Sequence, residues 1–162
     1  MFIKAKNRTL ELTVPVVMGI LNATPDSFSD GAPYSLEQLL LKADCFVKEG
    51  AKIIDVGGES TRPGWKSISI QQEIDRVCPL IEAISENIDV MISVDTYKPK
   101  VMEAALHSGA HVVNDITGLR DPLSIRIASE TNAAVCIMHM NSNLENMHEP
   151  AVEKDIFDDV KT

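Results

Sequence analysis

The sequence has few cysteines and no long apolar run, and each shortage excludes a class of protein. The three cysteines are odd in number and widely separated, and apolar residues flank each of them: Cys45, Cys78 and Cys136. This pattern indicates reduced thiols in a core rather than disulfides or metal ligands. No stretch approaches the roughly 20 consecutive apolar residues of a membrane span, and the N-terminus lacks an apolar signal region. We therefore expect a cytoplasmic protein with no membrane partner.

The sequence also has few positively charged residues. Lys and Arg number 15 against 24 Asp and Glu, which gives a formal net charge of −9. A generic nucleic-acid surface needs a basic face, so we expect no nucleic-acid partner. A small anionic substrate remains compatible with this composition if positive charge is concentrated locally. The 162 residues and the 44% hydrophobic content fit one domain with a substantial core.

The sequence does contain a regular alternation of short apolar strand candidates with amphipathic helix candidates. Ser35 with Gln38 forms a predicted capping box, and Asp121-Pro122 is a typical helix start. Pro79 lies inside the second helix candidate, where it removes a hydrogen bond and is expected to kink the helix. The strands are expected at 16–21, 52–58, 89–95, 111–115 and 134–140, and the helices at 35–49, 70–86, 99–109 and from 121 onward.

Alternation of this kind predicts an α/β fold with a parallel sheet and right-handed crossovers. Two architectures fit: a doubly wound open sheet and a (β/α)8 barrel. No glycine-rich dinucleotide fingerprint follows the first strand, which weakens the first alternative. A barrel needs eight strands and usually ~250 residues. Under the barrel interpretation, residues 1–162 are the N-terminal portion of a single barrel domain, with its first five strands and four to five helices, and the C-terminal elements lie outside this sequence.

Polar residues stand just past the predicted carboxyl ends of the strands, where ligands bind in both architectures. Each has a plain alternative as a turn, capping or surface residue, but their agreement on one edge favours a ligand site. No Ser-His pair and no cysteine in a polar loop offers a nucleophile, so we expect a site that binds and polarises its substrate. His139 and His148 lack partners at metal-ligand spacing, which argues against zinc. The strand-end residues are Asn22, Asp55, Thr61, Arg62, Asp95, Asn114, Asp115 and His139.

Five segments, in order from about residue 15 to 149, resemble the successive motifs of the dihydropteroate synthases. They are VMGILNATPDSFSDG, IIDVGGESTRPG, ISVDTYKP, GAHVVNDITGL and VCIMHM. The resemblance implies a (β/α)8 barrel that, with the help of Mg²⁺, joins 6-hydroxymethyl-7,8-dihydropterin diphosphate to p-aminobenzoate and releases 7,8-dihydropteroate and diphosphate. In the family this transferase step of folate biosynthesis is the target of sulfonamides. The family is typically dimeric, so the resemblance also implies a homodimer for the full-length protein.

The resemblance implies roles for individual residues. Asn22 matches the asparagine that helps to hold Mg²⁺ and the diphosphate, and Thr61 and Arg62 match loop residues near the diphosphate. Asp95 and Asn114 match the pair that hydrogen-bonds the pterin edge. The catalytic candidates are therefore Asn22, Arg62 and Asp95. The remaining matches are Ile116 and Met138, which contact the pterin ring, and Phe28, Asp30 and Pro63, which order around the second substrate where sulfonamides compete.

The chain departs from the family pattern in two ways. Ala32 and Pro33 follow SDG, where the family usually has a second glycine. Family sequences also continue for roughly another hundred residues, with a second pterin-binding Asp, a Lys against the pterin and an Arg-x-His anion site, so we expect the chain alone to be inactive. Two other functions remain open. One is a pterin-binding barrel that moves a methyl group from a methylated folate to a corrinoid, which gives no reason for TPDSFSDG and STRPG together. The other is a non-catalytic pterin-binding module.

Overall fold

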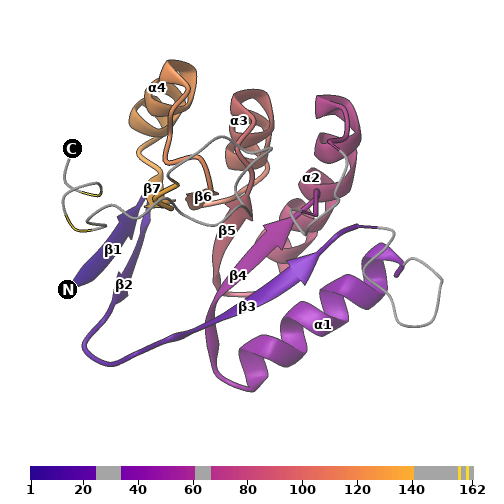
Figure 1. Cartoon of the computed structure of the whole chain (residues 1–162). Helices are drawn as coiled ribbons and strands as arrows, with labels where there is room; N and C mark the ends of the chain where they lie inside the picture. The colour runs from indigo at the N-terminus through magenta and orange to yellow at the C-terminus, as the bar shows by residue number, and fades with distance from the viewer. Residues whose placement is uncertain (25–33, 61–66, 141–156, 158–159, 161–162) are drawn as a thin grey trace.

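The computed structural model describes residues 1–24, 34–60, 67–140, 157 and 160, and its main feature is a five-stranded parallel sheet (Figure 1). The strands lie side by side in chain order, and each neighbouring pair is parallel. This order matches the first five strands of a (β/α)8 barrel, so the predicted fold class is confirmed. A doubly wound sheet, whose strand order reverses, does not fit. The strands are β3 (Val17–Asn22), β4 (Ala51–Gly57), β5 (Met91–Asp95), β6 (Val112–Asp115) and β7 (Ala134–Ile137).

The connecting helices cover one face of the sheet (Figure 1), and the predicted capping residues begin two of them. Ser35 Oγ accepts from Gln38 N at 3.2 Å, and Ser35 N donates to Gln38 Oε1 at 2.9 Å. Asp121 Oδ1 accepts from Leu123 N at 2.8 Å. Among the described residues, no helix has the length and apolar character needed to cross a membrane. The helices are α1 (Leu36–Lys48), α2 (Ile70–Asn87), which continues through Pro79, α3 (Pro99–His107) and α4 (Pro122–Thr131).

The main core lies between the helices and the sheet. Ile54 and Val56 on β4, and Ile92 and Val94 on β5, have no exposed surface and belong to this core. Because successive side chains of a strand point to opposite faces, the residues between them face the other side of the sheet. That second, inward face carries Asp55, Gly57 and Asp95, so the apolar packing of the helices fixes the position of the polar inward residues.

An antiparallel hairpin precedes the sheet, and the sequence analysis did not predict it. Its strands are β1 (Phe2–Ala5) and β2 (Arg8–Glu11). Ile3 and Leu10 from the hairpin pack on a small apolar cluster at the amino ends of the sheet strands, made of Ile53, Met91 and Val112. The hairpin therefore covers the end of the sheet opposite to the strand ends that carry the polar residues.

The thiol prediction is correct in one respect and wrong in another. All three cysteines are free, as predicted for reduced thiols, but only Cys78 is partly buried. Cys45 and Cys136 are exposed, so they are not core residues. Cys136 lies on β7, an outer strand of the sheet, where Ile137 is also 59% exposed. Apolar neighbours in the sequence indicate burial only where another element covers both faces of the strand.

Close packing of α2 on the end of β4 depends on Gly58. A Cβ atom at this position would lie 2.7 Å from Val77 Cγ1, inside van der Waals contact, and 3.0 Å from Glu73 Cγ. We expect Gly58→Ala to lower the free energy of unfolding by about 1–3 kcal/mol, because the helix has to move away from the strand. Denaturant unfolding measures this change. Val77→Ala removes the clashing methyl groups, so the double variant should lose less than the sum of the two single losses. Simple additivity would contradict this steric explanation.

Candidate functional site

Strand register places the predicted strand-end residues in one row on the inward face of the sheet. Asn22 pairs with Gly57, Gly57 with Asp95, and Asp95 with Asn114. The next partner, on β7, is Cys136. Since paired residues of neighbouring strands share a face, four strands bring an amide, a carboxyl, a second amide and a thiol into a single line.

Gly57 leaves a gap in this row. A Cβ atom built at Gly57 would lie 3.4 Å from Asn22 Oδ1 and 3.6 Å from Asp95 Oδ2. The side-chain oxygen atoms of two strand ends therefore border the same small space above Gly57. The gap offers a ligand two oxygen acceptors on either side of bare backbone.

Asp55 lies one row deeper on the same face and orients Asn114. It is 3% exposed, and its Oδ2 accepts from Asn114 Nδ2 at 3.3 Å. Burial raises the pKa of the Asp55 carboxyl, and the neighbouring Ser93 hydroxyl and Asn114 amide oppose that rise without cancelling it. Because the Asn114 amide nitrogen is engaged with Asp55, its carbonyl oxygen is left to accept from a ligand.

Asp95 stands in an environment that resists its negative charge. Burial and the like charges of Asp55, Glu73 and Asp115 raise the pKa of the Asp95 carboxyl to about 7. A carboxyl that is desolvated and surrounded by acids lowers its energy by keeping its proton or by receiving donors from a ligand. Asp95 does not cap the following helix, because the N-cap residue of α3 is Lys98. Its side chain is therefore not used to begin α3.

Asn114 and Asp115 point to opposite sides, as strand alternation predicts. Asp115 turns away from the row and binds its own loop. Its Oδ1 accepts from Thr117 N at 2.7 Å, and its Oδ2 accepts from Leu119 N at 3.0 Å. Asp115 therefore shapes the turn after β6, and Asn114 is the member of the pair that faces the site.

The two predicted apolar contacts lie beyond the row. Ile116 follows Asn114 by two residues and is partly buried, and Met138 follows Cys136 by two residues and is 40% exposed. Met138 N donates to Asp115 O at 3.1 Å, which joins the turn after β6 to the end of β7. Both residues are thus at the same end of the sheet as Asn114. His139, next along the chain, is exposed.

Several predicted site residues lie outside the described part of the chain. These are Phe28 and Asp30 in the segment 25–33, and Thr61, Arg62 and Pro63 in the segment 61–66. His148 falls in a further such segment, 141–156. Sequence reasoning missed one member of the row, Cys136. Its spacing of two from Met138 was the available signal, since residues two apart in a strand share a face.

The residues present fit Mg²⁺ only as a partial set of ligands. The described residues contain no group of three or more His, Cys, Asp or Glu that could hold a metal ion. Asn22 Oδ1 and Asp95 Oδ2, however, border the gap above Gly57, and oxygen is the ligand atom that Mg²⁺ prefers. Mg²⁺ commonly binds through one or two protein oxygens, with water and substrate phosphates completing its shell. The chemistry of these two oxygens is compatible with that mode.

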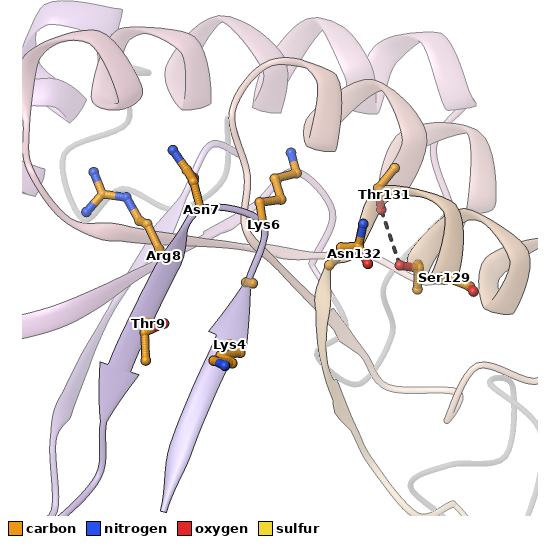
Figure 2. Close-up of a pocket in the computed structure, with 11 residues that line it drawn as sticks. Lys4, Lys6, Asn7, Arg8, Thr9, Ser129, Thr131 and Asn132 are labelled. Atoms are coloured by element: carbon orange, nitrogen blue, oxygen red, sulfur yellow. Dashed lines mark hydrogen bonds between the residues drawn. The ribbon is translucent and has the colours of Figure 1, made fainter.

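A groove at the other end of the sheet is a weaker candidate for the functional site (Figure 2). It lies between the β1–β2 hairpin and the end of α4, and Lys4, Lys6 and Arg8 line it. Two of these cations already have partners: Lys6 Nζ donates to Leu106 O at 2.5 Å, and Arg8 Nη1 lies 2.7 Å from Asp89 Oδ1. Lys6 and Arg8 thus already interact with a carbonyl group and a carboxylate of the protein itself.

The chain is similar to known proteins both in sequence and in structure. The model of the pterin binding enzyme family matches residues 18–162. The Escherichia coli K12 dihydropteroate synthase is 47% identical over 157 residues, which cover 96% of this chain and 56% of that enzyme. The Yersinia pestis dihydropteroate synthase, solved with a sulfonamide drug, superposes with a TM-score of 0.90 at 45% identity and covers 99% of this chain and 59% of its own.

A third similar protein was solved with a pteroate. The Burkholderia cenocepacia dihydropteroate synthase, complexed with 7,8-dihydropteroate, has a TM-score of 0.82 at 39% identity, over 97% of this chain and 53% of its own. The chain therefore spans somewhat more than half the length of the relatives it matches.

The raised pKa of Asp95 predicts an unusual pH dependence of stability. Between about pH 4 and 7 the folded chain holds a proton on Asp95 that the unfolded chain releases, so the free energy of unfolding falls as pH rises. Each unit of pKa difference corresponds to about 1.4 kcal/mol. Asp95→Asn should remove this fall and be more stable than the parent at pH 8.

Chemical denaturation at pH 4, 6 and 8 tests this expectation. Asp75→Asn, on the exposed side of α2, is the matched control and should follow the parent at each pH. If Asp95→Asn were less stable than the parent at pH 8, the repulsive environment of Asp95 would be refuted.

Proposed function

Because the chain belongs to the family of pterin-binding enzymes, we propose that it is the N-terminal portion of a dihydropteroate synthase, with residues 1–162 forming part of a single (β/α)8 domain. The reaction is the condensation of 6-hydroxymethyl-7,8-dihydropterin diphosphate with p-aminobenzoate, giving 7,8-dihydropteroate and diphosphate. The observation that supports it best is the inward row of Asn22, Asp95 and Asn114. We further propose that the complete protein acts on these small molecules in the cytoplasm as a homodimer.

Asp95 and Asn114 recognise the edge of the pterin. A pterin carries N–H donors and a ring acceptor along one edge, and a carboxylate can accept from two donors at once. The Asn114 carbonyl, oriented by the bond from its amide nitrogen to Asp55, adds a third acceptor direction. Pterin N–H groups would donate hydrogen bonds to the Asp95 carboxylate, and such bonds favour its ionised form. Ile116 and Met138, at the same end of the sheet, provide apolar contact for the ring.

The diphosphate is assigned to the second strand-end loop and to Asn22. Thr61 and Arg62 supply a hydroxyl and a guanidinium, which are suited to phosphate oxygens. Asn22 Oδ1, with diphosphate oxygens and water, is the group that would hold Mg²⁺, whose chemical contribution is to neutralise the charge of the departing diphosphate. Arg62 stabilises the same charge, and the chain supplies no nucleophile to the reacting carbon. Catalysis by Asn22, Arg62 and Asp95 is therefore positional and electrostatic.

The second substrate is assigned to residues of the two loops. Phe28, Asp30 and Pro63 are placed around p-aminobenzoate, and this is also where a sulfonamide would compete. The amine of p-aminobenzoate attacks the carbon that bears the diphosphate, a C–N bond forms as the C–O bond breaks, and the amine loses a proton. The row at the strand ends holds the pterin while this exchange takes place at its 6-substituent.

Turnover of the complete polypeptide tests the proposed function. With both substrates and Mg²⁺, we expect formation of 7,8-dihydropteroate together with diphosphate. The 162-residue chain by itself should be inactive, since β3 and β7 are then open edges and the rest of the barrel is absent. Absence of product from the complete, folded protein would refute a synthase and favour a binding module.

Pterin binding should depend on Asp95 and on pH. In the complete protein, Asp95→Asn should weaken pterin binding by about 1.5–3 kcal/mol, because a charge-assisted hydrogen bond is lost. The parent should bind the pterin more tightly as pH rises toward the Asp95 pKa of about 7, and then level off. Asp95→Asn should lose this dependence. Isothermal titration with a pterin ligand at pH 5.5 and 8 measures both effects, and an unchanged dissociation constant would remove Asp95 from the site.

A further inference from the structure

Three charged side chains are buried together beside the candidate site. Glu59 lies just after β4, Glu73 on α2 and Lys98 just after β5. Their side chains are only 4%, 1% and 10% exposed, respectively. Lys98 Nζ lies 2.5 Å from Glu59 Oε2 and 2.7 Å from Glu73 Oε2. We call these three residues the buried triad. Glu59 and Lys98 stand in two of the motifs quoted above, IIDVGGESTRPG and ISVDTYKP, but the chemistry described so far gives none of the three residues a role.

Glu59 connects both flanks of the segment 61–66. It precedes that segment by two residues, and its Oε2 accepts from Ile68 N, beyond the segment, at 2.8 Å. Lys98 Nζ also donates to Ile68 O at 2.8 Å. The other oxygen of Glu59, Oε1, accepts from Tyr97 OH at 2.9 Å, and Tyr97 OH lies 3.2 Å from Ser67 Oγ. The residues on the far side of the segment are therefore bonded to Glu59, which stands two residues before it.

Glu73 connects the buried triad to the strand end that carries Asp95. Its Oε1 accepts from Thr96 Oγ1 at 2.5 Å, and Thr96 directly follows Asp95. Lys98 N donates to Thr96 Oγ1 at 3.3 Å, so the turn after β5 is bonded to the triad twice. The negative charge of Glu73 is one of the causes of the raised pKa of Asp95. The segment 96–98 is thus fixed relative to α2.

Stability alone does not explain such a group. Burying charges costs several kcal/mol per ion, and apolar residues of similar size are often equally stable in their place. Burial lowers the pKa of Lys98, but its bonds to Glu59 and Glu73 outweigh burial and raise it. Lys98 therefore remains charged, with two buried carboxyl groups, those of Glu59 and Glu73, beside it. In some proteins buried polar and ionic groups instead fix one geometry of the chain.

We propose that the buried triad is a positioning device that fixes the two flanks of the segment 61–66 against the strand end of Asp95. This rests on the proposed function, which assigns Thr61 and Arg62 of that segment to the diphosphate. Glu59, Glu73 and Lys98 touch no substrate; they set where the diphosphate-binding residues stand relative to the pterin-binding row. Losing Glu59 should therefore affect the diphosphate far more than the pterin ring.

Glu59→Gln in the complete protein is the decisive variant. Gln has the same size, but it keeps one acceptor oxygen where Glu59 uses two, and it loses the charge that pairs with Lys98. Two ligands are compared by isothermal titration: 6-hydroxymethyl-7,8-dihydropterin diphosphate with Mg²⁺, and the same pterin with a free hydroxymethyl group. We expect affinity for the diphosphate ester to fall about tenfold, while affinity for the free alcohol changes by less than about twofold.

Two further variants keep the test interpretable. Tyr97→Phe removes one hydrogen bond to Glu59 without leaving a charge unpaired, and it should produce the same selective loss, smaller in size, even if Glu59→Gln fails to fold. Lys48→Met is the matched control, because it breaks the exposed Asp44–Lys48 pair on α1 and should change neither affinity.

The outcomes separate the two proposals. A selective loss for the diphosphate ester in either variant supports the positioning role. Equal weakening of both ligands, or no change in folded variants, overturns it while the synthase assignment stands. If the parent protein binds neither ligand, the proposed function fails and the positioning role fails with it.

Discussion

The register between neighbouring parallel strands is the constraint on which the candidate site depends. Residues that pair across β3, β4, β5 and β6 share one face, so Asn22, Asp95 and Asn114 meet although 92 residues separate the first from the last. The residues that precede these paired residues in the strands, such as Val56 and Val94, point to the opposite face and are buried against the helices. Slipping one strand by a single residue would turn its polar residue into the apolar core. Helix packing on one face thereby secures the chemistry on the other.

The elements that were predictable from the sequence have strong local signals. The strands of the sheet are short apolar runs, and caps such as Ser35 and Asp121 mark the helices. The β1–β2 hairpin gave little signal, because each strand has only four residues and its turn begins at Lys6 with a φ of 52° rather than at the usual Asn-Gly. The burial of its apolar residues Ile3 and Leu10 can be explained only when the position of the sheet that they cover is known.

The site could be predicted in part for a related reason. Asn22, Asp95 and Asn114 could be predicted as site residues because each comes at the end of an apolar stretch of sequence. The buried triad was not, since 39 residues separate Glu59 from Lys98 and charged residues are normally assigned to the surface. The exposure of Cys136 could not be predicted either, because the burial of a residue on an outer strand depends on which other element covers that strand. Local patterns predict which face a residue takes, but partners distant in the chain decide what surrounds it.

The bond from Asn114 to Asp55 has a consequence for the selectivity of the site among heterocycles. An amide side chain carries an oxygen that accepts and a nitrogen that donates hydrogen bonds. A rotation of the amide group by half a turn exchanges their positions. Asp55, which is 3% exposed, removes this freedom by engaging the Asn114 nitrogen. A neutral apolar residue in its place would let the amide turn and present N–H groups instead of an oxygen. Under the proposed function, the site would then favour rings whose edge carries the reverse order of donors and acceptors, so Asp55 would act through Asn114 on the choice between isomeric heterocycles.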